Sequence, residues 1–250
     1  MIRVLTDFDG AGLRGSHYSR MIRAHLSAYG TAYDFCRFYE IAFRRRIGII
    51  TVFNGSVTAD ICDGAVVSPA AEREFAEFLD FMLPEAAELP EELSARRLFT
   101  GYVPHVRTFF EISAADSSDG LFEPDPQAVF DTVCGGGADY GLWLTDTVRR
   151  LNLGSSRLFG YESAVLTVRF MCSGAAYITD VATPAPDFGR GYARELLTRV
   201  SKLLHESGFM PYLAADSDSE GYYRSLGFSA HGSDTIYLLK AGRRSRITEY

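Results

Sequence analysis

The segment PDFGRGYARELL (186–197) carries the residue types best suited to chemistry, because two glycines flank an arginine where a helix is expected to begin. Gly189 and Gly191 let the backbone turn tightly and approach a ligand closely. The first N–H groups of a helix lack internal partners and lie at the positive end of the helix dipole. With the charge of Arg190, this pattern predicts a site for an anion of pyrophosphate size. The alternative is an ordinary strand-to-helix turn with a solvated arginine.

The elements around this segment follow from hydrophobic periodicity. Residues 163–172 and 175–184 read as two strands, and 191–208 as a strongly amphipathic helix that ends at Gly208. Helices over 125–134 and 140–154 precede these elements, and a strand over 212–216, a short helix over 220–227 and a last strand over 235–240 follow them.

The pattern of the first half of the chain indicates an order of helices and strands similar to that of the second half, but without the glycine loop. We expect a short strand over 2–5, helices over 18–29 and 70–83, and strands over 35–42, 47–54 and 56–62. The acidic, proline-punctuated segment 84–93 predicts an exposed connection or a surface helix.

VATPAPDFGRGYARELL (181–197) followed by YYRSLGF (222–228) resembles the GNAT superfamily of acyl-CoA-dependent N-acyltransferases. The resemblance covers roughly residues 163–240. It implies an α/β (α+β) fold: a mixed, mostly antiparallel sheet flanked by helices, with two tandem GNAT-like halves as an option. We therefore expect a degenerate GNAT-like or accessory domain over 1–105 and a GNAT domain over 106–250.

The resemblance also implies where acetyl-CoA would bind as co-substrate. The strand end would hold the pantetheine arm through its main chain, and a neighbouring strand over 212–216 would splay away to leave a gap for the thioester. The loop and helix start would hold the pyrophosphate. Phe188 departs from the family pattern, which has Arg or Gln there. The implied cofactor-binding residues are Val181, Ala182, Thr183, Phe188, Gly189, Arg190, Gly191, Tyr192 and Ala193.

Tyr223 matches the frequent general acid of this family, which protonates the departing thiolate of CoA. A phenol is chemically suited to that step. The alternative is a core aromatic that packs against Phe228, although Tyr222 is the better candidate of the pair for packing.

The general base has two candidates. Asp180 lies on the strand that precedes the loop, and strict alternation would place Asp180 and Ala182 on one face and Thr179 on the other. Asp180 could instead bond a neighbouring backbone group. Asp216 is the second candidate, with capping of the following helix as its alternative role.

The stretch VLTDFDG (4–10) resembles the first motif of haloacid-dehalogenase-type phosphatases, in which Asp7 would be the nucleophile. That chemistry needs a lysine and a later acidic pair that holds Mg²⁺. Lys202, Asp216 and Asp218 are the available candidates for those roles, but the surrounding motifs do not match. Ala11 stands where the phosphatase motif has Thr, and no Gly-Asp pair introduces the later acidic residues. Asp7 and Asp9 are better interpreted as turn and capping groups.

The amino-acid composition excludes several other classes of protein. The formal net charge of −7 argues against a nucleic-acid-binding surface or an anionic membrane surface. The 4 cysteines and 5 histidines are too scattered for a metal or disulfide framework. No apolar run is long enough to span a bilayer, so we expect a cytoplasmic protein without a metal cofactor.

The sequence thus predicts an N-acetyltransferase in which a primary amine of a small molecule or peptide attacks acetyl-CoA directly in a ternary complex. A non-catalytic acyl-CoA sensor is the alternative, and a phosphatase using Asp7 is the third reading. The first half of the chain would form one wall of the substrate site or a contact between two subunits. In the second case the protein would be a homodimer.

Overall fold

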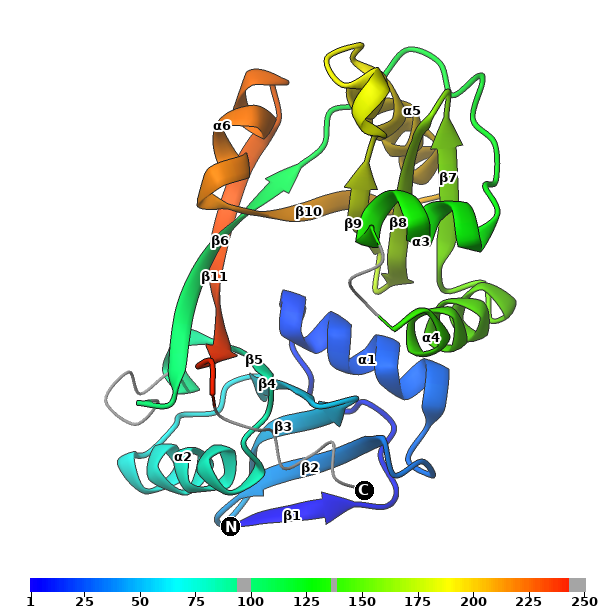
Figure 1. The fold of residues 1–250 in the computed structure, drawn as a ribbon. Coiled ribbons are helices and arrows are strands. Elements are labelled where there is room, and N and C mark those ends of the chain that lie inside the picture. The colour runs from blue at the N-terminus through cyan, green and yellow to red at the C-terminus, as the bar shows by residue number, and fades with distance from the viewer. Residues whose placement is uncertain (94–99, 136–138, 243–250) are drawn as a thin grey trace. The chain divides into compact units, whose positions relative to one another are not determined.

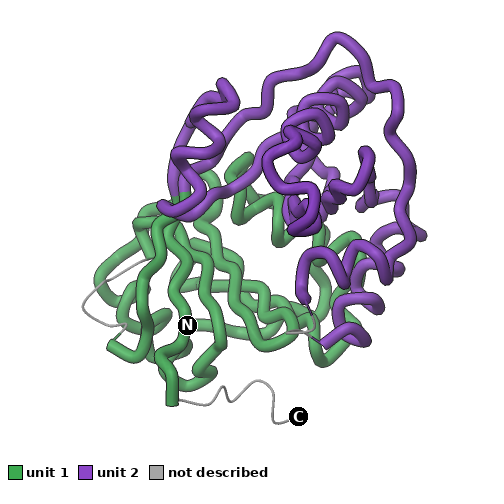
Figure 2. The backbone as a smooth tube through the Cα atoms, turned by 45° about the horizontal axis from the view of Figure 1, so that its top comes forward, with its two compact units in different colours: residues 1–107, 234–250 green, residues 108–233 purple. Residues whose placement is uncertain are grey.

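The chain folds into two compact units, which Figure 2 colours separately. The computed structural model describes residues 1–93, 100–135 and 139–242. One unit contains Met1–Arg107 and the chain from Asp234 onward, and the other contains Thr108–Ser233. Two strands cross the boundary between the units: β6 (Tyr102–Glu111) and β11 (Ser229–Leu239).

This division differs from the predicted boundary between 105 and 106 in two respects. The first unit runs to Arg107, and the chain returns to that unit at Asp234. The last strand was assigned to the second half, yet its residues Thr235–Leu238 pair antiparallel with β5 (Ala86–Leu89) of the first unit. A strand belongs where its backbone hydrogen bonds are made, and sequence order does not reveal that partner. Residues 243–250 of the predicted second domain lie outside the described residues.

The first unit places one helix on each face of its sheet (Figure 1). The sheet order is β1-β2-β3-β4-β5, with β11 and β6 beyond β5. Helix α1 packs on one face with Phe38, Ile49 and Phe53, and α2 packs on the other with Tyr39 and Ile50. The further elements of this unit are β1 (Ile2–Leu5), α1 (His17–Tyr29), β2 (Cys36–Ala42), β3 (Arg46–Phe53), β4 (Ser56–Ile61), α2 (Pro69–Met82) and the 3₁₀ turn η1 (Glu91–Leu93).

The segment expected to be an exposed connection or a surface helix is instead β5. Ala87 and Leu89 are buried, and Glu88 between them pairs with Arg107. The acidic composition of this segment predicted solvent exposure. Glu88 can be buried because Arg107, which lies on the distant strand β6, neutralises its charge.

The second unit has the same layered plan. The sheet order is β10-β9-β8-β7, with β6 beside β10. Helix α5 covers one face and α3 the other (Figure 1). The elements are α3 (Pro126–Cys134), α4 (Tyr140–Asn152), β7 (Arg157–Tyr161), β8 (Ala164–Cys172), β9 (Ala175–Ala182), η2 (Ala185–Asp187), α5 (Tyr192–Glu206), β10 (Met210–Asp216) and α6 (Ser217–Ser225).

Each unit contains a mixed sheet in which most of the strand pairs are antiparallel. The strand pairs β1–β2, β2–β3, β3–β4, β5–β11, β7–β8 and β8–β9 are antiparallel. The pairs β4–β5 and β9–β10 are parallel, and in each a helix connects the two strands. The predicted fold class, an α/β (α+β) architecture of two similar halves, is confirmed. Within the described residues, no helix combines the length and apolarity that a membrane crossing requires.

Candidate acyl-CoA site in the second unit

The parallel strands β9 and β10 are paired only over the first part of each strand. Their pairing runs from Ala175 opposite Met210 to Ile178 opposite Leu213, and it stops there. Strand β9 continues to Ala182 and β10 to Asp216. The carboxyl ends of two adjacent parallel strands therefore leave unpaired backbone between them, as the predicted thioester gap requires.

Helix α5 begins without a capping side chain. Its N-cap is Gly191, at φ 82°, and no side chain accepts a hydrogen bond from the first turn. Gly189 has φ 80°, so both glycines occupy the left-handed region that other residues adopt only at a cost. A Cβ at either glycine would have no described atom within 4 Å, so space is open above the helix start.

The free N–H groups at this helix start number fewer than the sequence suggests. Phe188 N donates to Ala185 O and Arg190 N donates to Asp187 O. The N–H of Phe188 is therefore already used within the η2 turn, and the place of Phe188 in the predicted phosphate-binding loop stays a prediction. Five N–H groups have no acceptor in the described part of the chain: those of Gly189, Gly191, Tyr192, Ala193 and Arg194.

The side chains of the loop are exposed. Phe188 is 69 % exposed and offers no hydrogen-bond donor. Arg190 forms an ion pair with Asp187 at 3.2 Å, and the Arg190 side chain is 59 % exposed. An incoming anion would compete with Asp187 for this guanidinium, and an exposed pair of this kind costs little to break.

The strand end that precedes the loop contributes residues to both faces of the sheet. Val181 packs with the α5 core, where Tyr192 and Tyr223 also lie. Ala182 packs with the smaller core between the sheet and α3, and Thr183 is half-buried. Val181, Tyr192 and Tyr223 thus pack against the same core on one face of the sheet.

Strict alternation fails along this strand end. Thr179 Oγ1 donates to Asp180 Oδ2 at 3.1 Å, although alternation would place the two side chains on opposite faces. Asp180 has φ 54°, and the β8–β9 register shifts at this point. The prediction of opposite faces is wrong because a β-bulge inserts one extra residue here.

Tyr223 is half-buried in an aromatic cluster. Its ring centroid lies 5.7 Å from that of Phe110 and 6.3 Å from that of Phe228. Burial raises the pKa of Tyr223 to about 12, with a smaller contribution from Tyr222. The phenol is therefore a protonated donor at neutral pH. The expectation that Tyr222 is the packing member of the pair is wrong, because Tyr222 is 46 % exposed.

Asp216 is exposed at the N-cap of α6, and its side chain does not cap that helix. Its predicted alternative role as a capping group is not observed. Asp9, in contrast, behaves as the turn residue expected from the sequence, because its carboxylate accepts from Ala11 N at 2.8 Å. Lys202 is paired with Glu206 on the surface of α5.

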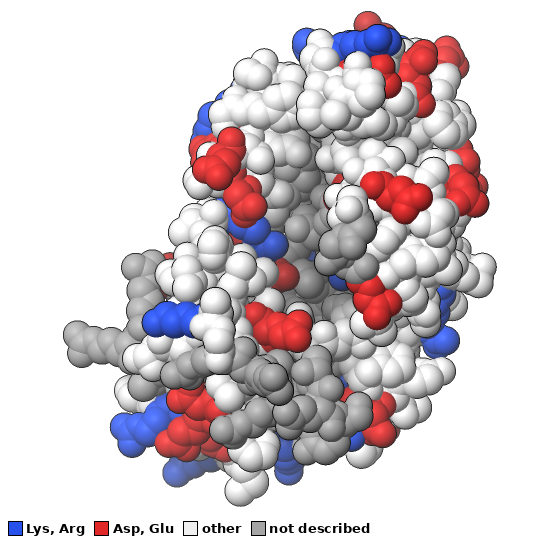
Figure 3. All heavy atoms as spheres, viewed as in Figure 1, with Lys and Arg blue, Asp and Glu red and all other residues white. Residues whose placement is uncertain are grey.

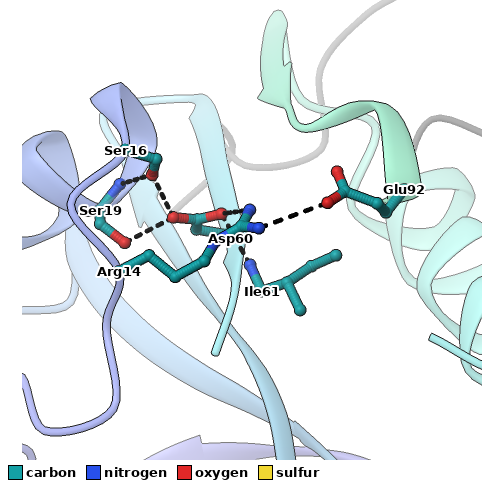
Figure 4. Close-up of polar contacts among 6 residues, drawn as sticks. All are labelled: Arg14, Ser16, Ser19, Asp60, Ile61 and Glu92. Carbon is teal, nitrogen blue, oxygen red and sulfur yellow. Dashed lines mark hydrogen bonds and ion pairs between the residues drawn. The ribbon is translucent and has the colours of Figure 1, made fainter. Parts of the chain in front are cut away.

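The equivalent position of the first unit is filled by protein side chains. Pairing between β4 and β5 stops at Thr58 opposite Glu88, and beyond it Asp60 is fully buried. Its carboxylate accepts hydrogen bonds from the side chains of Arg14, Ser16 and Ser19 and from Ile61 N, and Arg14 also reaches Glu92 (Figure 4).

Helix α2 also begins differently from α5. The hydroxyl of its N-cap Ser68 accepts from Ala71 N, and Pro69 has no N–H to offer. Glu72 adds a negative charge to the first turn. The first unit therefore lacks an anion-binding helix start within the part of the chain that the structure describes.

A second buried polar cluster in the first unit surrounds Arg107. Its Nη2 lies 2.8 Å from Glu88 Oε2 and 2.5 Å from Asp234 Oδ2, and His17 Nε2 lies 3.4 Å from Glu88. His17, Glu88 and Asp234 offer three potential metal ligands within 4.8 Å of one another. The guanidinium of Arg107 already supplies the positive charge between the two carboxylates.

This cluster predicts a loss of stability in acid. Burial alone would raise the pKa of Glu88, but the hydrogen bond from His17 and the charge of Arg107 outweigh it and lower the pKa to about 2. Unfolded glutamate titrates near pH 4.3, so the stabilisation is complete above that pH and is lost as the pH falls toward 2. We expect the free energy of unfolding to drop by roughly 3 kcal/mol over this window. Urea titrations at several pH values would measure it, and a Glu88→Gln variant should lack that part of the slope.

Comparison with known proteins supports the same fold. No protein-family model matches the chain, and neither does any curated protein. Among solved structures, an acetyltransferase of the GNAT family from Colwellia psychrerythraea is 13 % identical, with a TM-score of 0.57 over 96 % of this chain and 100 % of the other. A GCN5-related N-acetyltransferase from Kribbella flavida is 12 % identical, with a TM-score of 0.59 over 92 % and 98 %.

A two-domain protein matches at similar length. The tandem GNAT protein from the clavulanic acid biosynthesis pathway, in a structure without acetyl-CoA, is 12 % identical, with a TM-score of 0.54 over 98 % of this chain and 99 % of the other. At these identities the likeness is one of fold. Together with the repeated plan of the two units, it shows that this chain has a tandem GNAT fold.

Proposed function

We propose that the chain is an N-acetyltransferase whose second unit transfers the acetyl group of acetyl-CoA to a primary amine. The observation that carries the proposal is the difference between the two helix starts. Helix α5 follows a splayed parallel strand pair with an uncapped, glycine-opened first turn, whereas α2 follows a similar pair with Ser68 and Pro69. Only the former suits a bound pyrophosphate.

The residues of the second unit suit the cofactor from end to end. The N–H groups of Gly189, Gly191, Tyr192 and Ala193 would receive the pyrophosphate, with Arg190 beside them. The main chain of Val181, Ala182 and Thr183 would hydrogen-bond the pantetheine arm along the strand edge that β10 has left. Acetyl-CoA would then supply the thioester in the gap.

The reaction is direct attack in a ternary complex. The amine nitrogen bonds to the thioester carbon, the C–S bond breaks, and one amine proton passes to a base, for which Asp180 is the first choice and Asp216 the second. Tyr223 donates its hydroxyl proton to the leaving thiolate. Exchange of a proton through water returns both side chains to their starting states.

The acceptor is a small-molecule or peptide amine. The net charge of −7 favours a cationic acceptor over an acidic one. Acidic and basic side chains are scattered among uncharged ones on the face that Figure 3 shows, outside its grey residues.

The Tyr223→Phe variant tests the enzyme. Removal of the donated proton should lower kcat about 100-fold while the Kd for acetyl-CoA stays unchanged, since the ring packing is retained. Thiol release from acetyl-CoA with a panel of amines measures the rate, and calorimetry measures the Kd. Tyr222→Phe is the matched control and should retain full activity, because Tyr222 is exposed next to it.

Phe188 favours a second candidate function, a non-catalytic acyl-CoA sensor, because its exposed ring removes one side-chain contact with the phosphates. The same assays separate the two candidates. Acetyl-CoA binding with no thiol release from any amine would identify the sensor. Equal turnover by Tyr223→Phe and the wild type would remove Tyr223 from the mechanism without removing the activity.

A further inference from the structure

Asp180, a candidate general base, lies in a β-bulge of strand β9. Thr167 of β8 pairs with Thr179, and Val165 pairs with Ala182, so β9 advances by three residues where β8 advances by two. Asp180 is the residue that takes the left-handed conformation, at φ 54°. Non-glycine residues in that conformation carry strain that surrounding contacts must maintain, and such strain concentrates at functional sites.

Contacts on both faces of the sheet fix this bulge. Val181 packs with the α5 core and Ala182 with the α3 core, so the backbone on the C-terminal side of Asp180 is held from both sides. Pairing with the parallel strand β10 has stopped two residues before Asp180, because the last β9–β10 pair is Ile178 with Leu213. The bulge therefore lies at the start of the splayed gap.

One hydrogen bond orients the Asp180 carboxylate. Thr179 Oγ1 donates to Asp180 Oδ2 at 3.1 Å. The negative charge of Asp180 also contributes, after burial, to the raised pKa of the Cys134 thiol. Asp180 Oδ1 makes no hydrogen bond with the described residues.

We propose that Thr179 is a positioning residue for the acyl transfer: it holds Oδ2 of Asp180 so that Oδ1 can accept the proton of the attacking amine. The inference rests on the proposed function and assigns the proton-accepting step to Asp180 in preference to the exposed Asp216. A hydrogen bond to a charged carboxylate is among the stronger ones and restricts its rotation. The proton moves from the amine nitrogen to Oδ1 as the N–C bond forms, and Tyr223 supplies the proton that the thiolate gains.

A double-mutant cycle on Thr179 and Asp180 tests the proposal, with the best acceptor among spermidine, kanamycin and a lysine-containing peptide. Thr179→Val should lower kcat about 10-fold with the KM for acetyl-CoA unchanged, and Thr179→Ser should restore kcat to within about twofold. Asp180→Asn should lower kcat about 100-fold. Adding Thr179→Val to Asp180→Asn should cost nothing further, because Thr179 acts through the carboxylate.

Thr167→Val is the matched control, because Thr167 is the cross-strand partner of Thr179. Its buried hydroxyl makes no hydrogen bond within the described part of the chain, so the same substitution should leave kcat unchanged. Wild-type kcat in Thr179→Val, or an equal loss in the Asp180→Asn background, would overturn the positioning role while leaving the transferase intact. Absence of turnover by the wild-type protein would overturn the proposed function, and this inference with it.

Discussion

The variant with Arg190→Glu and Gly191→Asp should lose measurable binding of acetyl-CoA, with the Kd raised at least about 100-fold. Two negative charges would replace one positive charge and one open position at the start of α5. The N–H groups that would receive the pyrophosphate then face carboxylates that both repel the ligand and hydrogen-bond the same donors. Isothermal titration calorimetry with acetyl-CoA measures the effect directly, without dependence on the unidentified acceptor.

Backbone strain is the competing explanation, since Gly191 has φ 82° and any side chain there costs about 1 kcal/mol. Gly208 follows the other end of the same helix at φ 81°, also with no described atom within 4 Å of an added Cβ. The Gly208→Asp variant therefore imposes the same kind of strain as Gly191→Asp and adds the same single negative charge, away from the proposed cradle. It should lower Tm and keep the wild-type Kd. If the loop variant still binds acetyl-CoA as the wild type does, the phosphate cradle is misassigned.

The Arg107→Met variant should destabilise the protein by about 3–5 kcal/mol, the largest stability effect that we expect from one substitution. Arg107 is the shared donor to two carboxylates, and the side chain of Asp234 is fully buried. Its Nε also donates to Asp234 Oδ1 at 3.0 Å. Methionine preserves much of the volume but leaves two negative charges in a site that water barely reaches. Urea unfolding followed by circular dichroism at pH 7 measures the loss.

Arg37→Met provides the matched control for this substitution. Arg37 pairs with Asp34, but those side chains are 48 % and 92 % exposed, so its loss should cost no more than about 1 kcal/mol. The pH dependence adds a second test. Without Arg107, burial favours a protonated Glu88, so the deficit relative to the wild type should shrink as the pH falls from 7 to 4. A deficit that stays constant over this range would show that lost packing, rather than unpaired charge, causes the destabilisation.

Local patterns in the sequence were sufficient for the helices and for the candidate phosphate cradle. The apolar face of α5 is built from neighbours three and four residues apart, and the uncapped glycine start lies directly before it. The same holds for α2, whose Ser68 and Pro69 signal its start. These features depend on contacts within a few residues, and for that reason one sequence was enough to locate them.

The roles of Glu88, Arg107 and Asp234 could not be predicted in this way. Arg107 and Asp234 are separated by 127 positions, and they meet only because β11 returns to pair with β5. The acidic segment around Glu88 looked exposed for the same reason, since its compensating charge comes from another strand. Strand partners are set by tertiary packing, which local hydrophobic periodicity does not encode.

The proposed active site divides in the same manner. The sequence by itself predicted the Gly189–Gly191 loop and the strand before it, because residue type and local spacing define them. The candidate groups Tyr223 and Asp180 followed from the resemblance of this region to GNAT proteins. Only the tertiary structure decided that β10 leaves β9 after Ile178, that a bulge turns Asp180 toward Thr179, and that Tyr223 is packed while Tyr222 is exposed. Each of these depends on register and on which side chains arrive from other elements, and those are properties of the packed chain as a whole.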